Sequence, residues 1–198
     1  TRSGENVKLA DVIDEAIERA AVVVGEKSPE LSGEERRSIA ETVAVAALKY
    51  ADLSSERIKD YVFSYDRMLA FEGNTGPYLL YANVRIRSIF RKAAEQDLAT
   101  GFEAAPYTLT EAAEKRLALA LLRYGSTIRS VGDSLEPHRL CGYLYDLAGL
   151  FSSFFESCPV LRAPDEATRL SRLRLCDLTS RVLTDGLDAL GIQALDRM

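Results

Sequence analysis

Apolar residues recur every three or four positions along most of the chain, and this spacing predicts α-helices. In the first third it predicts one helix over about residues 9–25 and a second that ends near Asp52. A glycine and Pro29 interrupt the pattern between these two helices. Ser32 and Glu35 have the spacing of a capping box, so we expect the second helix to begin there.

The remainder of the chain continues the helical pattern. Further helices are predicted over about residues 75–92, 110–124, 126–134, 137–158 and 165–190. On the helix after Pro137, we expect an inward face made of Leu140, Leu144, Leu147, Ala148, Phe151, Phe155 and Cys158. Residues 97–109 are rich in small residues and proline and are predicted to be a linker, and Tyr61–Phe63 to be a short extended segment. The sequence therefore predicts an all-α fold, a helical bundle preceded by an acidic helical region.

Charge is unevenly distributed along this pattern. The chain of 198 residues has 25 Lys and Arg against 30 Asp and Glu, a formal net charge of −5. Residues 1–76 hold 10 basic and 15 acidic side chains, whereas residues 77–198 hold 15 of each. Domains that bind nucleic acid through a general electrostatic field are usually basic. Any contact with nucleic acid must therefore use local arginines and shape.

Composition argues against a membrane-spanning or a secreted protein. Hydrophobic residues make up 47% of the chain, enough for a substantial core. No apolar run approaches the roughly 18 residues of a membrane span, and the first residues lack the apolar stretch of a signal peptide. Cys141, Cys158 and Cys176 have no CxxC spacing and are expected as free thiols on apolar helix faces. We therefore expect a cytoplasmic protein with no membrane partner.

No catalytic or metal-binding motif is evident in these residues. Walker A and GxGxxG loops do not occur. His138, the single histidine, could act as a general base, but no nucleophile with a supporting acid lies near it in sequence. A local structural role at the start of its helix is the simpler interpretation. We also interpret four acidic residues as solvated surface: Asp52, Asp60, Asp66 and Glu72. We assign no catalytic residue and no metal site.

One predicted helix, residues 75–92, carries an unusual face. At 100° per residue, a stripe about 80° wide holds Tyr78, Tyr81, Arg85, Ser88 and Lys92. Aromatic rings beside guanidinium groups suit unpaired nucleic-acid bases, which stack on the rings while arginine binds phosphate. An ordinary amphipathic helix shows the same pattern, with tyrosines at the edge of the core and cations in water. From the stripe alone, both interpretations remain open.

Longer segments match a known family. They are Leu48–Ser54, Asp60–Phe63, Met68–Tyr78, Leu144–Phe151, Cys158–Leu161 and Leu190–Met198. In their order and their spread over the chain, these segments resemble the arginyl-tRNA synthetases. One departure is Asp196, which stands before Arg197 where many members of that family have glutamate.

The resemblance implies two regions. Residues 1–73 would be the helical end of the catalytic region, which contacts the tRNA stem, and residues 74–198 a DALR-type anticodon-binding domain. The remnant of a loop that closes over ATP would be Thr1, Arg2, Ser3 and Gly4. In the full-length enzyme, ATP with magnesium would drive the attachment of arginine to its tRNA. We expect neither to be bound to this chain alone, because the upstream nucleotide-binding fold is not among these residues.

The resemblance also implies binding residues. The family's anticodon contacts include a tyrosine on the helix that opens the domain and the C-terminal methionine, and Tyr81 (or Tyr78) and Met198 match these positions. Further candidates are chosen for charge or for position beside that face. The complete set of expected tRNA-binding residues is Tyr78, Tyr81, Arg85, Arg87, Tyr143 and Met198.

The expected partners are arginine tRNA and the upstream catalytic half of the synthetase, and DNA is not expected. An alternative is a helical protein-interaction module without tRNA specificity, because an acidic helical bundle can present a groove to another protein. The arginines around residues 85–91 favour RNA over this alternative.

Overall fold

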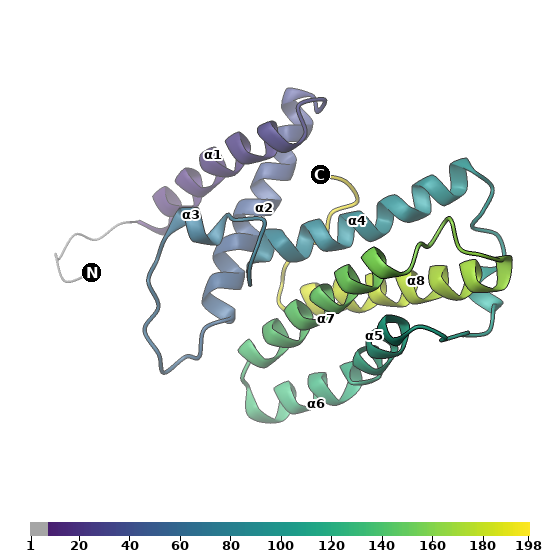
Figure 1. The fold of residues 1–198 in the computed structure, drawn as a ribbon. Coiled ribbons are helices and arrows are strands. Elements are labelled where there is room, and N and C mark those ends of the chain that lie inside the picture. The colour runs from purple at the N-terminus through teal and green to yellow at the C-terminus, as the bar shows by residue number, and fades with distance from the viewer. Residues whose placement is uncertain (1–7) are drawn as a thin grey trace.

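The computed structural model describes residues 8–198, and almost all of its regular structure is helical (Figure 1). The elements are α1 (Leu9–Lys27), α2 (Gly33–Leu53), α3 (Tyr65–Met68), α4 (Gly76–Glu95), the 3-10 turn η1 (Phe102–Ala104), α5 (Ala112–Leu122), α6 (Tyr124–Ser134), α7 (His138–Ser157) and α8 (Glu166–Ala189). No residue in the described range forms a strand, and the predicted all-α fold is confirmed. The expected ATP-loop residues 1–4 lie outside this range.

Helix boundaries follow from local capping chemistry. Ser32 Oγ accepts a hydrogen bond from the Glu35 N–H at 3.2 Å, and the Glu35 carboxylate accepts one from the Ser32 N–H at 3.2 Å, which completes the predicted capping box of α2. At the start of α4, Thr75 Oγ1 accepts from the Tyr78 N–H at 3.2 Å. After α8, Gly191 adopts a left-handed conformation with φ of 67°, as expected for the glycine that ends a helix.

Helix α4 joins the two groups of helices. Figure 1 shows α1 and α2 as a hairpin beside one end of α4, and α7 and α8 side by side along it. Helices α5 and α6 pack on α7, on the side of the bundle away from α4. The apolar core is continuous through all of these layers. The position of α4 therefore fixes how the α1–α2 hairpin sits relative to the bundle.

The contact between α2 and α4 is unusually close. A Cβ atom at Gly76 would lie 2.5 Å from the carbonyl oxygen of Ala46, so only glycine fits at this position. One turn along α2, Tyr50 is fully buried. Its hydroxyl lies 2.9 Å from the carbonyl oxygen of Cys141 on α7 and 2.6 Å from the side-chain amide of Asn74. Burial raises the pKa of the Tyr50 hydroxyl well above its usual range. A single buried side chain thus ties α2 to α7 and to the loop before α4.

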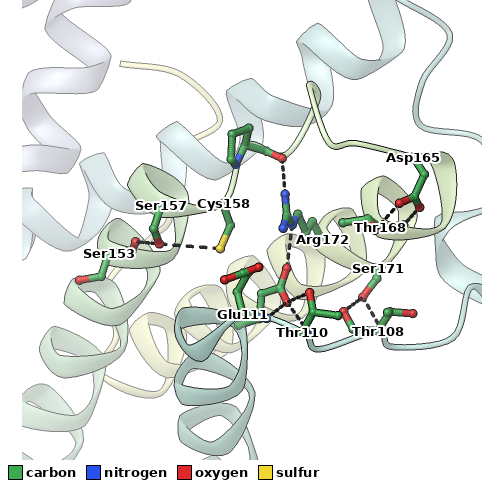
Figure 2. Close-up of polar contacts among 12 residues, drawn as sticks. Thr108, Thr110, Glu111, Ser153, Ser157, Cys158, Asp165, Thr168, Ser171 and Arg172 are labelled. Atoms are coloured by element: carbon green, nitrogen blue, oxygen red, sulfur yellow. Dashed lines mark hydrogen bonds and ion pairs between the residues drawn. The ribbon is translucent and has the colours of Figure 1, made fainter.

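A second buried polar cluster holds the linker and the α7–α8 loop against α8 (Figure 2). The fully buried Glu114 carboxylate accepts hydrogen bonds from the N–H groups of Thr110 and Glu111, both at 2.9 Å. Arg172 Nε donates to the same carboxylate at 2.7 Å, and its Nη1 donates to the carbonyl oxygen of Pro159 at 2.9 Å. The buried charges are therefore paired, and the remaining donors are used to fix two loops.

The segments outside the main helices also agree with the sequence predictions. Residues 96–111 hold only η1, as expected of a linker, and the three cysteines are buried free thiols. Tyr61–Phe63 lies outside any helix, although the structure assigns no strand there. Helix ends differ by a few residues: α4 continues to Glu95, and α6 begins at Tyr124.

We expect Gly76→Ala to lower the free energy of unfolding by about 1–3 kcal/mol, because the new methyl group meets backbone atoms of α2 that cannot move aside without shifting the helix. The matched control is Gly132→Ala in α6, where an added Cβ meets nothing within 4 Å. That change should be neutral or stabilising by roughly 0.5–1 kcal/mol. Urea unfolding followed by circular dichroism measures both, and equal effects would contradict a tight α2–α4 contact.

The ionisation of Glu114 should make the free energy of unfolding depend on pH. Burial alone would raise the pKa of this carboxyl, but the N–H of Glu111, the Arg172 guanidinium and the N–H of Thr110 together hold the pKa below its ordinary value. A lowered folded-state pKa stabilises the protein above the unfolded-state pKa of about 4.3, and this contribution is lost as the pH falls through the folded-state pKa.

Glu114→Gln leaves the Arg172 charge buried without a carboxylate, so we expect it to lower the free energy of unfolding at pH 7 by roughly 3–5 kcal/mol. The difference between the wild-type protein and this variant should shrink as the pH is lowered below about 4. Urea titrations at pH 7 and at pH 3 measure it. A difference that does not change with pH would contradict this account.

Candidate functional site

The outer face of α4 gathers aromatic rings and cations from separate segments. The Tyr81 ring on α4 meets the Phe71 ring edge to face, with centroids 6.3 Å apart. The guanidinium carbon of Arg85 lies 5.8 Å from the centroid of the Tyr81 ring and 5.4 Å from that of Phe155 on α7. Lys27, at the end of α1, places Nζ 5.0 Å from the Phe71 centroid and 5.9 Å from the Tyr81 centroid. We call these five residues the aromatic–cation platform.

The platform is open to solvent and carries free positive charge. The side chains of Tyr81 and Phe155 are 39% and 37% exposed. Within residues 8–198, neither Lys27 nor Arg85 forms an ion pair with a carboxylate. Exposed rings provide stacking surfaces for nucleic-acid bases, and cations held over rings remain able to bind phosphate. This is chemistry suited to a single-stranded or looped RNA.

Tyr78, one turn before Tyr81 on α4, faces a different part of the molecule. Its ring packs edge to face against Tyr145 of α7, with centroids 5.7 Å apart. Both rings line a hollow of about 880 Å³ that α5, α6 and α7 also border. Tyr143 lies at the same hollow, donates its hydroxyl hydrogen to a backbone carbonyl of α5 at 3.0 Å, and has its pKa raised to about 12 by burial. The structure therefore divides the predicted stripe, because Tyr81 belongs to the platform and Tyr78 and Tyr143 share this hollow.

Arg87 holds the C-terminal tail. Its guanidinium pairs with the Asp196 carboxylate, and Arg91, one turn further along α4, donates to the Asp196 carbonyl oxygen at 2.8 Å. The next residue, Arg197, pairs with a glutamate of α2, and the C-terminus lies between α2 and α4 in Figure 1. Met198 is half-buried and packs against the core. Of these expected site residues, Arg87 thus fixes a neighbouring segment, and Met198 packs against the core at the end of the tail that Arg87 holds.

Sequence reasoning missed three platform residues. Lys27 and Phe71 were not singled out, since each becomes significant only when α1 and the loop after α3 pack beside α4. Phe155 was expected on the inward face of its helix, and this prediction is wrong. Phe154 is fully buried and takes the inward position, so Phe155 points to the exposed edge. Spacing in threes and fours from Phe151 fits both residues, so it could not separate them.

The other residues considered from the sequence are not members of the platform, although Asp66 and Glu72 line a hollow with its Lys27 and Phe71. His138 is half-buried in the first turn of α7 and borders a separate hollow of about 700 Å³ with Glu56 and Glu136. The four acidic residues interpreted as solvated surface are exposed, which confirms that interpretation: Asp52, Asp60, Asp66 and Glu72. In the described range, no group of three His, Cys, Asp or Glu side chains is arranged to hold a metal ion, and no helix is both long and apolar enough to span a membrane.

Comparison with known proteins identifies the class to which this arrangement belongs. Residues 79–198 match the DALR anticodon binding domain, and residues 1–65 match the catalytic domain of class I tRNA synthetases of the arginine type. The chain belongs to the DALR anticodon-binding family, which places the platform and the Tyr78–Tyr143 hollow in or beside a tRNA-recognition domain.

Individual relatives indicate the type of synthetase more specifically than the family match does. The chain is 52% identical to the arginine–tRNA ligase of Edwardsiella ictaluri and 52% identical to that of Escherichia fergusonii; each match covers 100% of this chain and 34% of the relative. It is also similar to the crystal structure of arginyl-tRNA synthetase from Plasmodium falciparum, with a TM-score of 0.85 and 33% identity over 97% of this chain and 34% of that one. The Thermus thermophilus arginyl-tRNA synthetase gives a TM-score of 0.84 and 33% identity over 97% of this chain and 32% of that chain. The chain thus spans about a third of the length of these relatives.

Proposed function

We propose that this chain recognises the anticodon arm of arginine tRNA. The observation that carries the proposal is the aromatic–cation platform, which gathers exposed rings and two cations around α4, the helix in which the DALR match begins. The boundary between a stem-contacting region, residues 1–73, and an anticodon-binding region, residues 74–198, is part of the same proposal. The family matches over residues 1–65 and 79–198 support it.

In this proposal, unstacked bases of the anticodon loop stack on Tyr81 and Phe155, and the adjoining phosphates bind Lys27 and Arg85. The exposure of the two rings and the position of the cations over them support these roles. In the same proposal, Met198, at the end of the tail that Arg87 and Arg91 hold against α4, also contacts the anticodon loop. Arg87 acts through Asp196, because its guanidinium is already used to hold the tail.

The hollow beside Tyr78 and Tyr143 would take a neighbouring nucleotide. Its wall includes Arg123 and several hydroxyl side chains, which suit a phosphate and a ribose: Ser126, Thr127, Ser130 and Ser153. Arg139, also in the wall, is already paired with Glu136. Both tyrosine rings are partly exposed at its surface, so a base could pack against them.

The full reaction, in which arginine is joined to its tRNA with ATP and magnesium, is proposed for the longer protein that would include this chain. Residues 8–198 offer no cluster of acidic or other ligating side chains suited to magnesium, and the expected ATP-loop residues lie outside that range. No step of the ATP chemistry is therefore assigned to the described residues. A cytoplasmic location fits three buried cysteines that remain unpaired.

A binding titration tests the proposed function. Fluorescently labelled arginine tRNA, the same tRNA with a swapped anticodon, and an unrelated tRNA are each titrated at two salt concentrations. We expect saturable binding of arginine tRNA that weakens by roughly ten-fold or more when the anticodon is swapped. The reason is that the loss of one base-stacking contact costs on the order of 1–3 kcal/mol.

Two other results would contradict the proposal. Equal and strongly salt-dependent binding of all three RNAs would mean general attraction to phosphate. No binding of any RNA would favour the alternative of a protein-interaction module.

Tyr81→Ala should weaken the binding of arginine tRNA by roughly ten-fold or more and leave the helical circular dichroism signal unchanged, because an exposed ring contributes stacking and little to the core. Tyr107→Ala is the matched control. Tyr107 is 43% exposed and has the guanidinium of Arg174 4.3 Å from its ring centroid, but it lies on the linker and is not part of the platform. If both variants lose the same affinity, or neither loses any, the platform is not the binding site.

A further inference from the structure

The C-terminal tail, residues 190–198, binds α2 at two places. Near the end of α2, Lys49 Nζ donates to the carbonyl oxygen of Gly191. Near the start of α2, Glu35 pairs with Arg197. At about 1.5 Å of rise per residue, Glu35 and Lys49 are roughly 21 Å apart along the helix. The residue before Arg197 is held by α4, so the tail links α2 to α4 along much of the length of α2.

The Glu35 carboxylate binds two partners at once. Its Oε2 accepts hydrogen bonds from the Ser32 N–H at 3.2 Å and from the Ser32 hydroxyl at 2.9 Å, and its Oε1 pairs with Nη2 of Arg197. The hydrogen bonds from Ser32 and the charge of Arg197 lower the pKa of Glu35, so the side chain is ionised at neutral pH. Because Ser32 already orients the carboxylate, Arg197 meets an acceptor in a fixed position.

Lys27 of the platform lies one short turn before this carboxylate. Lys27 is the last residue of α1 and Ser32 is the N-cap of α2, so only residues 28–31 separate them. In that turn, the N–H of the buried Ser28 donates back to α1 at 2.9 Å, and the Leu31 N–H donates to the Ser28 carbonyl oxygen at 3.3 Å. The start of α2 therefore fixes where the end of α1 lies, and with it the Lys27 ammonium beside the rings of the platform.

We propose that the ion pair between Arg197 and Glu35 positions Lys27 at the aromatic–cation platform, so that a contact outside the platform sets part of its affinity for RNA. Neither Glu35 nor Arg197 is a member of the platform. Their ion pair joins the α1–α2 turn to the tail, and the tail is joined to α4, the helix that carries Tyr81. This inference rests on the proposed function, in which the platform binds the anticodon loop.

The negative charge of Glu35 separates positioning from simple electrostatic attraction. If only the overall field mattered, removal of an acidic side chain would strengthen the binding of RNA. Positioning requires the opposite result, because Arg197 loses its partner and the turn that carries Lys27 is held less firmly. Glu35→Gln is the suitable change, since glutamine still serves in a capping box and only the charge is lost.

Titration with labelled arginine tRNA tests the inference. We expect Glu35→Gln and Arg197→Gln each to weaken binding by about three- to five-fold, near the upper end for exposed ion pairs, because Ser32 holds the carboxylate in place. The double variant should bind no more weakly than either single variant, since each change removes the same interaction. Arg197→Lys keeps the charge and should retain the affinity within about two-fold.

Glu41→Gln is the matched control. Glu41 lies on the same helix and pairs with Arg37 one turn away, at 3.2 Å, and not with the tail. The loss of its charge should leave the affinity for arginine tRNA unchanged or raise it slightly. All of these variants should keep the urea midpoint of the wild-type protein, because exposed ion pairs contribute little to global stability.

Hydrogen exchange of the free protein gives a readout that needs no RNA. Arg197→Gln should raise the exchange rates of the Ser28 and Leu31 amides by about three- to five-fold, because their hydrogen bonds lie in the turn that the ion pair holds. The amide of Leu135, which donates to Val131 at 2.8 Å at the end of α6, should exchange at the same rate in both proteins.

Three results would overturn the inference. The first is a Glu35→Gln variant that binds arginine tRNA as tightly as the wild-type protein or more tightly. The second is a weaker salt dependence of binding in Arg197→Gln alone, which would mean that Arg197 itself binds phosphate. The third is unchanged exchange of the Ser28 and Leu31 amides in Arg197→Gln. If the wild-type protein fails to bind arginine tRNA while these amides respond, the link from the tail to Lys27 stands and only the proposed function fails.

Discussion

The approach of α4 to α2 is the constraint on which the rest of the arrangement depends. Gly76 allows the start of α4 to lie directly against the backbone of α2, where any larger residue would collide. Tyr50, buried between them, also contacts α7 and the loop before α4. Because α4 packs on α7 and α8 along its other side, this contact sets the orientation of the α1–α2 hairpin relative to the bundle. The platform exists only in that orientation, since Lys27 comes from α1 and Phe155 from α7.

The helices could be predicted well from the sequence because apolar periodicity and capping residues both indicate the same helices that the tertiary packing uses. Periodicity placed the helices, and the side chains of Ser32 and Thr75 fixed where two of them begin. The candidate site was predicted only in part. Tyr81 and Arg85 share a helix, so spacing could bring them together. Lys27, Phe71 and Phe155 come from distant segments, and their convergence depends on tertiary packing that no spacing records. The pairing of Arg87 with Asp196 depends equally on where the C-terminal tail lies.

The structure also reconciles an acidic chain with RNA as the proposed partner. The net charge is −5, but the acidic excess belongs to residues 1–76, and within residues 8–198 neither cation of the platform forms an ion pair with a carboxylate. The buried charges of Glu114 and Arg172 have a different role. They pair with each other and form hydrogen bonds with the backbone of neighbouring loops, so they stabilise the fold. Binding through a few placed cations and rings favours selectivity for an unstacked loop over general attraction to phosphate.

The most direct test of the account uses the isolated anticodon stem-loop of arginine tRNA as a competitor against the labelled full-length tRNA. If the face of α4 reads the anticodon arm, the stem-loop should displace the full tRNA with an affinity within about ten-fold of it, and a stem-loop with a swapped anticodon should compete at least about ten-fold less well. A cognate stem-loop that fails to compete, while the full tRNA binds, would contradict the central claim, because the recognised features would then lie elsewhere on the tRNA.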